Sequence, residues 1–180
     1  DKANCFLLES VEGGAIRGRY SFIGLRPDLI WRCFGDRAEI NRHALTSDSA
    51  FEPCAEGAID SLSLITEESI IALPPCLPPM AAGLVGYMAY DTVRLVEHLP
   101  DANPDVIGTP DGIFVRPTVI AVFDTIEDKI SLITPVRPEA GISAEQAWEL
   151  ASDRLTEIVE AFENSLPHPQ QDTEIDIPEP

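Results

Sequence analysis

The stretch CFLLESVEGGAIRGRYSFIGL, from Cys5 to Leu25, consists of two apolar segments separated by a polar, Gly-containing turn. Residues 5–11 are predicted to form one strand and residues 19–25 a second, with Glu12-Gly13-Gly14 as the turn signal between them. A short connection of this kind joins antiparallel neighbours, so the chain is predicted to begin with an antiparallel pair.

The segment that follows extends this pair into a meander. Residues 29–34 and 37–42 are predicted to be a third and a fourth strand around a Gly35-Asp36 turn. Residues 50–64 carry Ala, Ile and Leu at mixed spacing, and we expect a short helix there.

The middle of the chain is less regular. LPPCLPPM, at 73–80, holds four prolines, which remove donors and restrict φ, so no regular element is expected. Residues 81–91 resemble a strand in which Gly83 and Gly86 permit close approach of another backbone. Residues 91–99 are predicted to be a short helix capped by Asp91.

The C-terminal half gives the clearest signals. Residues 113–124 and 129–136 are predicted to form a hairpin, and the almost continuous apolar character of its first strand indicates a central position. Ser143 and Gln146 match a capping box. Apolar residues then recur at helical spacing: Ala147, Trp148, Ala151, Leu155, Ile158, Val159 and Phe162. These elements together predict an α+β fold with a mostly antiparallel sheet and flanking helices.

Composition bounds the domain organisation and the partners. The chain has 180 residues, 44% of them hydrophobic, and a formal charge of -19. That charge argues against a nucleic-acid backbone or an anionic membrane surface as partner. Residues 1–165 are predicted to form one domain. Residues 166–180 are Pro-rich and acidic and are expected to be a linker to further sequence. Four cysteines without metal-ligand spacing are expected to be reduced thiols, mostly in the core.

Polar residues lie at the end of the first predicted strand and at the start of the second. Glu9 could accept from an ammonium group, Ser10 and Ser21 could donate or accept, and Arg19 could pair with a carboxylate. If the strands pair, these groups meet near one sheet edge, as a site for a free amino acid would require. The alternative is a structural ion pair between Glu9 and Arg19. No catalytic motif is present.

At these residues the sequence resembles the anthranilate synthase component I family. FLLES, GRYSFIG, GLVGYMAYD and TVIAVFDTIEDKISLITPV occur in the family's order and at family-like spacing, over roughly residues 5–165. The resemblance implies one half of a two-domain layered fold, with a C-terminal chorismate-binding domain following the linker. It implies that the whole enzyme makes anthranilate from chorismate and ammonia, with magnesium held by that further domain. This chain would then contain no catalytic residue and would be inactive alone.

The resemblance also implies partners and a regulatory site. A glutamine amidotransferase would supply ammonia, and the enzyme would be cytoplasmic. The FLLES strand would contribute Leu8, Glu9 and Ser10 to an allosteric L-tryptophan site, with Arg19, Tyr20 and Ser21 opposite. Two alternatives remain: aminodeoxychorismate synthase component I, and a stand-alone amino-acid-binding module.

Overall fold

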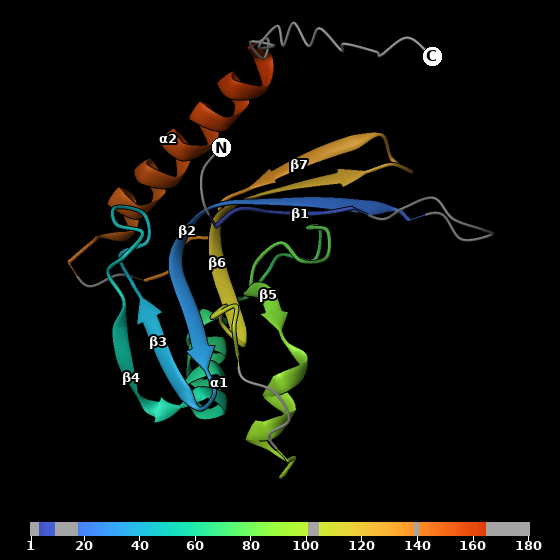
Figure 1. The fold of residues 1–180 in the computed structure, drawn as a ribbon. Coiled ribbons are helices and arrows are strands. Elements are labelled where there is room, and N and C mark those ends of the chain that lie inside the picture. Colours follow the sequence, from blue (N-terminus) through green and yellow to red (C-terminus); the bar gives the residue numbers. More distant parts are fainter. Residues whose placement is uncertain (1–3, 10–17, 101–104, 139–140, 165–180) are drawn as a thin grey trace, which may run out of the picture.

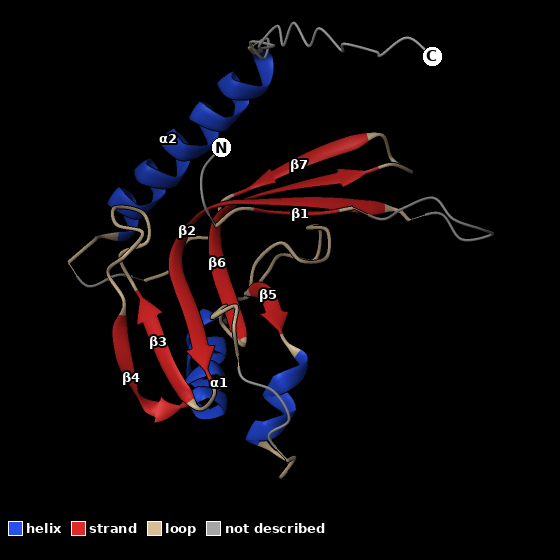
Figure 2. Ribbon diagram, in the orientation of Figure 1, coloured by secondary structure: helices blue, strands red, loops and turns tan. Residues whose placement is uncertain are grey.

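A computed structural model describes residues 4–9, 18–100, 105–138 and 141–164. Its strands form one antiparallel sheet in the order β4-β3-β2-β6-β5, with β1 added on β2 and β7 on β6. The strands are β1 (Phe6–Leu8), β2 (Tyr20–Phe34), β3 (Arg37–Asn41), β4 (Glu52–Gly57), β5 (Val85–Met88), β6 (Gly112–Asp124) and β7 (Lys129–Ile133). Two α-helices, α1 (Ala58–Ser69) and α2 (Ala144–Glu163), lie beside the sheet (Figure 2). The predicted α+β class and antiparallel sheet are confirmed.

The two longest strands, β2 and β6, form the centre of the sheet and bend along their length. The first half of β2 and the second half of β6 carry β1 and β7, and their other halves carry β3 and β5 (Figure 1). The register between them shifts between Pro27 and Leu29, where Arg26 has φ 51°. A bulge of this kind bends a strand without ending it. The two strands predicted over 19–25 and 29–34 are therefore one continuous strand.

The main core lies under the lower half of the sheet, where α1 covers it. Leu29, Trp31 and Cys33 on β2 are fully buried, and Ile65 of α1 packs against the same cluster. The indole Nε1 of Trp31 donates to Ser61 Oγ at 3.0 Å, so the one polar atom of this side chain has a partner inside the core.

The helix predicted over 50–64 is correct only in its second part, because residues 52–57 form β4. This strand is an edge strand, where the missing N–H of Pro53 costs no ladder hydrogen bond. The helix begins at Ala58, whose N–H donates to Asp36 Oδ1 at 2.9 Å. The first turn is thus capped by a residue of the β2–β3 turn, which local sequence cannot indicate.

The segment 81–99 also differs from the prediction. Only Val85–Met88 pairs as β5, and Tyr90–Leu95 forms a 3-10 helix rather than an α-helix. Asp91 does not cap it; the Asp91 carboxylate instead accepts from Arg94. The prediction of close backbone approach is confirmed at Gly86, where a Cβ would lie 1.9 Å from the carbonyl oxygen of Ile113, but it is wrong at Gly83, where a Cβ would meet no atom within 4 Å.

The hairpin and the last helix form as predicted. β6 and β7 pair around the 124–129 turn, and β6 is buried along most of its length. Ser143 Oγ accepts from Gln146 N while Gln146 Oε1 accepts from Ser143 N, which confirms the capping box. α2 then extends past the upper edge of the sheet (Figure 1). The proposed linker, 166–180, lies outside the described residues.

The cysteine prediction is correct in part. None of the four cysteines is joined to another by a disulfide. Cys33 is buried and Cys54 is half-buried, but Cys5 and Cys76 are exposed. Cys5 precedes the three-residue β1 and Cys76 lies in the Pro-rich segment, so neither is covered by a second layer.

Candidate functional site

The strand pairing on which the predicted site depends is present. β1 runs antiparallel to β2 with Leu8 opposite Phe22, and the same register continued by one residue places Glu9 opposite Ser21. Glu9 is exposed and Ser21 is half-buried. The strand pairing is confirmed, and Glu9 and Ser21 lie next to the residues that form its last pair, Leu8 and Phe22. Ser10 lies outside the described residues.

The alternation of side chains along a strand separates these residues onto two faces. Leu8 shares the face of Phe22 and Tyr20, whereas Glu9 and Ser21 point to the other face. Tyr20 packs against the buried cluster around Phe22, with a ring-centroid distance of 5.9 Å. A ligand that touched all of these residues would have to sit at the end of the pair rather than on one face.

Arg19 has a partner that the sequence did not predict. Its Nε lies 3.0 Å from both carboxylate oxygens of Asp124, and its Nη2 lies 2.7 Å from Asp124 Oδ2. Nη2 also lies 3.1 Å from Glu127 Oε1. The hydrogen bonds from Arg19 lower the pKa of Asp124 to about 2, and those to Asp124 raise the pKa of Arg19 above its ordinary value.

This ion pair joins the start of β2 to the end of β6, where Thr125 N also donates to Arg19 O at 3.0 Å. The structural pair considered for Arg19 thus forms with Asp124 instead of Glu9. A ligand carboxylate at Arg19 would have to share or displace Asp124. Glu9 remains an exposed carboxylate that could accept from an ammonium group.

Metal binding is a separate question, because the resemblance implies magnesium in the whole enzyme. Among the described residues no three His, Cys, Asp or Glu side chains come together in a way that could hold a metal ion. These residues do not fit a magnesium site, and no chemistry is assigned to the ion here. Within the same ranges, none of the helices combines the length and apolarity needed to cross a bilayer.

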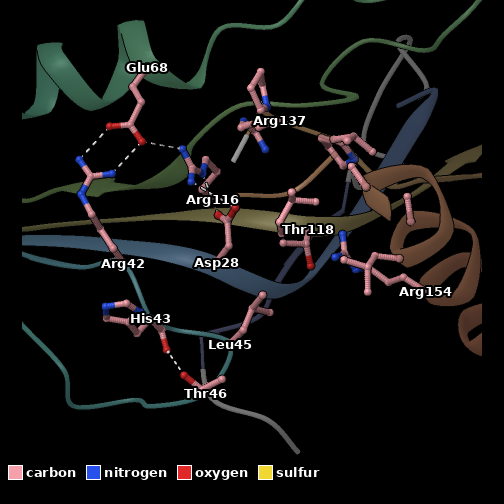
Figure 3. A pocket seen from close by; sticks show the side chains of 17 residues that line it. Asp28, Arg42, His43, Leu45, Thr46, Glu68, Arg116, Thr118, Arg137 and Arg154 are labelled. Atoms are coloured by element: carbon pink, nitrogen blue, oxygen red, sulfur yellow. Dashed lines mark hydrogen bonds and ion pairs between the residues drawn. The ribbon is translucent and has the colours of Figure 1, made fainter. Parts of the chain in front are cut away.

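Sequence reasoning missed two groupings. It did not pair Asp124 with Arg19, because that contact depends on the β2–β6 register, which places Tyr20 opposite Asp124. It also missed a pocket lined by four arginines from separate segments, Arg42, Arg116, Arg137 and Arg154 (Figure 3). For the Arg19–Asp124 pair, the only hint in the sequence is the turn TIED after a long apolar strand. No local pattern in the sequence indicates the arginine pocket.

Comparison with known proteins gives a consistent result. The chain is 43% identical over 166 residues to anthranilate synthase component 1 of Cereibacter sphaeroides, covering 92% of this chain and 33% of that protein. It is 34% identical to the Pseudomonas putida protein of the same name and 35% identical to that of Thermus thermophilus, covering 92% and 79% of this chain. It spans about a third of the length of these relatives. No family model matches.

A solved structure shares the fold. Anthranilate synthase component I from Streptococcus pneumoniae superposes with a TM-score of 0.65 at 20% identity, over 93% of this chain and 33% of that one. At this identity the likeness concerns the fold alone.

Proposed function

Because the chain is homologous to about a third of anthranilate synthase component I, we propose that it is the N-terminal regulatory and scaffolding part of that enzyme. The observation that carries the proposal is 43% identity over 92% of the chain to a relative of that name, together with the same fold in a solved structure. In the whole protein a chorismate-binding domain would follow and would hold magnesium. A glutamine amidotransferase would supply ammonia, and anthranilate would form in the cytoplasm.

The regulatory part of the proposal assigns the end of the β1–β2 pair to L-tryptophan. Glu9 would accept from the ammonium group, Ser10 and Ser21 would hydrogen-bond the ligand, and Leu8 and Tyr20 would contact its apolar part. The β1–β2 pairing supports this assignment, because it ends with Leu8 opposite Phe22, directly before Glu9 and directly after Ser21 in the sequence. Arg19, held by Asp124, would act chiefly by fixing the start of β2.

Inhibition at such a site would follow from the coupling between tryptophan binding and the equilibrium between active and less active arrangements of the protein. Tryptophan can lower activity only if it binds a low-activity arrangement of the protein more tightly than an active one. The strand end is suited to this role, since its contacts are few and a further surface would have to close over the exposed Glu9.

The test uses a protein that joins this chain to the remainder of the enzyme. Chorismate, magnesium and ammonium are supplied, and anthranilate fluorescence is followed with and without L-tryptophan. We expect anthranilate formation that tryptophan inhibits, and we expect Ser10→Phe to relieve inhibition while uninhibited turnover is largely kept. Ser49→Phe, at an exposed loop position, is the matched control and should remain inhibited.

Other outcomes would redirect the proposal. Consumption of chorismate without anthranilate would favour the aminodeoxychorismate branch. Absence of turnover, together with tryptophan binding to the 180-residue chain measured by calorimetry, would favour an amino-acid-binding module. Unchanged inhibition in Ser10→Phe would remove Ser10 from the pocket but would leave the enzyme assignment intact.

A further inference from the structure

A pocket of about 730 Å³ lies between the bend of β2 and β6, the end of α1 and the start of α2 (Figure 3). This volume is in the range of small-molecule sites. None of its lining residues belongs to the strand-end site proposed for tryptophan. It therefore requires its own explanation.

The charges on the pocket wall fall into two groups. In the first, Arg42 and Arg116 are matched by two carboxylates. Arg42 places both Nη atoms on Glu68, at 2.7 and 2.8 Å, and Arg116 binds Asp28 at 2.7 Å and Glu68 at 3.1 Å. The hydrogen bonds from Arg42 lower the pKa of Glu68, so this group is a balanced network of ionised side chains.

In the second group, Arg137 and Arg154 lack this balance. Among the described residues no carboxylate lies within ion-pair distance of either guanidinium. Arg154 Nη1 donates to Thr134 Oγ1 at 2.9 Å, and Arg137 Nη2 reaches the Ser69 carbonyl at 3.4 Å. The Nε of Arg137 is buried without a hydrogen-bond partner.

The absence of ion pairs at Arg137 and Arg154 in the described part of the chain is unusual in a protein with so many acidic residues. The protein has 31 acidic and 12 basic residues, so carboxylates are abundant, yet within the described ranges none forms an ion pair with the half-buried Arg137 or Arg154. Burial and the positive charge of Arg116 lower the pKa of Arg137, although the more distant carboxylates of Asp28 and Glu68 act in the opposite direction. Because a half-buried cation without a direct ion pair is costly, a bound anion would stabilise this arrangement.

The rest of the wall indicates the size and character of the ligand. Leu45, Val136, Ile142 and Leu150 supply apolar surface beside the arginines. Guanidinium groups bind carboxylates and phosphates in a planar, two-pronged geometry. We propose that this pocket binds a small dianion, a dicarboxylate or a phosphate-bearing molecule, through Arg137 and Arg154. The proposal does not depend on the tryptophan site or on the enzyme's activity.

The test is a calorimetric titration of the 180-residue chain with inorganic phosphate and, separately, with malonate, at constant ionic strength set by NaCl. We expect saturable binding at one site for at least one of the two probes. Arg137→Gln and Arg154→Gln should each weaken that binding about tenfold or more, since each removes a charge-assisted hydrogen bond. Phosphate alone would indicate a phosphate ligand, and malonate alone a dicarboxylate.

The matched control is Arg37→Gln, which removes one positive charge from an exposed position on β3 outside the pocket. Its affinity should equal that of the wild type. Far-UV circular dichroism checks that each variant folds, and Arg154→Gln carries the test if Arg137→Gln does not. Equal weakening in Arg37→Gln or absence of saturable binding would each overturn the proposal.

Discussion

The two α-helices in the described part of the chain differ in where they place their apolar residues. α1, with 12 residues, places Ala58, Ser61, Ile65 and Ser69 in the buried interior against the sheet. α2, with 20 residues, buries only Ala151 and Ile158. It leaves a row of large apolar side chains exposed on one face, Trp148, Val159 and Phe162, while the exposed Leu150 lies on the side that lines the arginine pocket.

The contrast teaches that the strength of a helical sequence pattern does not measure how much a helix contributes to its own domain. α2 has the capping box and the clear apolar period, whereas α1 has neither. An apolar stripe shows only that a helix has a face to bury. In α1 the described residues bury that face, and in α2 they mostly do not.

The largest expected effect tests the buried face of α1. Ile65 is 3% exposed in the Trp31 cluster, so Ile65→Ala should lower the free energy of unfolding by roughly 2–5 kcal/mol through lost burial and a residual cavity. Urea unfolding followed by far-UV circular dichroism measures it. Leu64→Ala, at a neighbouring position that is 51% exposed, is the control and should cost much less. Equal losses would mean that α1 does not cover the core.

The next largest effect on stability is expected from losing the hydrogen bond between Ser61 of α1 and Trp31. Ser61→Ala leaves the buried indole N–H of Trp31 without an acceptor, which should cost about 1–3 kcal/mol. The same urea experiment measures it, with the exposed Ser63→Ala as control. If Ser61→Ala proved as stable as wild type, the Trp31–Ser61 hydrogen bond would not hold α1 on the sheet.

A smaller effect is expected at the start of α2. Ser143→Ala removes the side-chain cap and should destabilise the first turn by about 1 kcal/mol. Faster amide hydrogen exchange at residues 145–148 would report it. Ser152→Ala, inside the helix, should leave exchange there unchanged. Global stability should change less than in Ser61→Ala, because few core contacts depend on α2, and a larger loss would contradict the comparison.

The sequence predicted α2, the β6–β7 hairpin and the β1–β2 pair because each signal is local: a capping box, an apolar run, a turn between two strands. It failed at β4 and at the start of α1. There Gly57 is followed by a helix capped by Asp36, a residue distant in sequence. The sequence also predicted two strands where β2 is continuous. A proline usually ends a strand, but Pro27 lies at a bulge within β2.

In the candidate site, too, contacts between neighbouring segments could be predicted and contacts between distant segments could not. The β1–β2 pairing, which ends at Leu8 and Phe22 beside Glu9 and Ser21, joins strands adjacent in sequence, so the sequence could indicate it. The partner of Arg19 depends on a register between strands about a hundred residues apart, and the arginine pocket gathers side chains from the segment after β3, from β6, from α2 and from the loop before α2. Contacts between segments that are distant in the sequence produce no periodic pattern from which they could be predicted.

The smallest expected effect on stability is at the exposed face of α2, and it is the sharpest test of the comparison. Trp148 is 72% exposed, so Trp148→Gln should change the free energy of unfolding by no more than about 0.5 kcal/mol. The 180-residue chain should nevertheless self-associate through this face, and the substitution should weaken that association, because exposed apolar patches favour contact with other surfaces. Sedimentation velocity at several concentrations measures both proteins, with Glu149→Gln as a control on the same helix. A wild-type chain that stays monomeric at every concentration would show that exposing this face has little cost. In that case the row of apolar side chains would not by itself argue that α2 packs against the remainder of a longer enzyme.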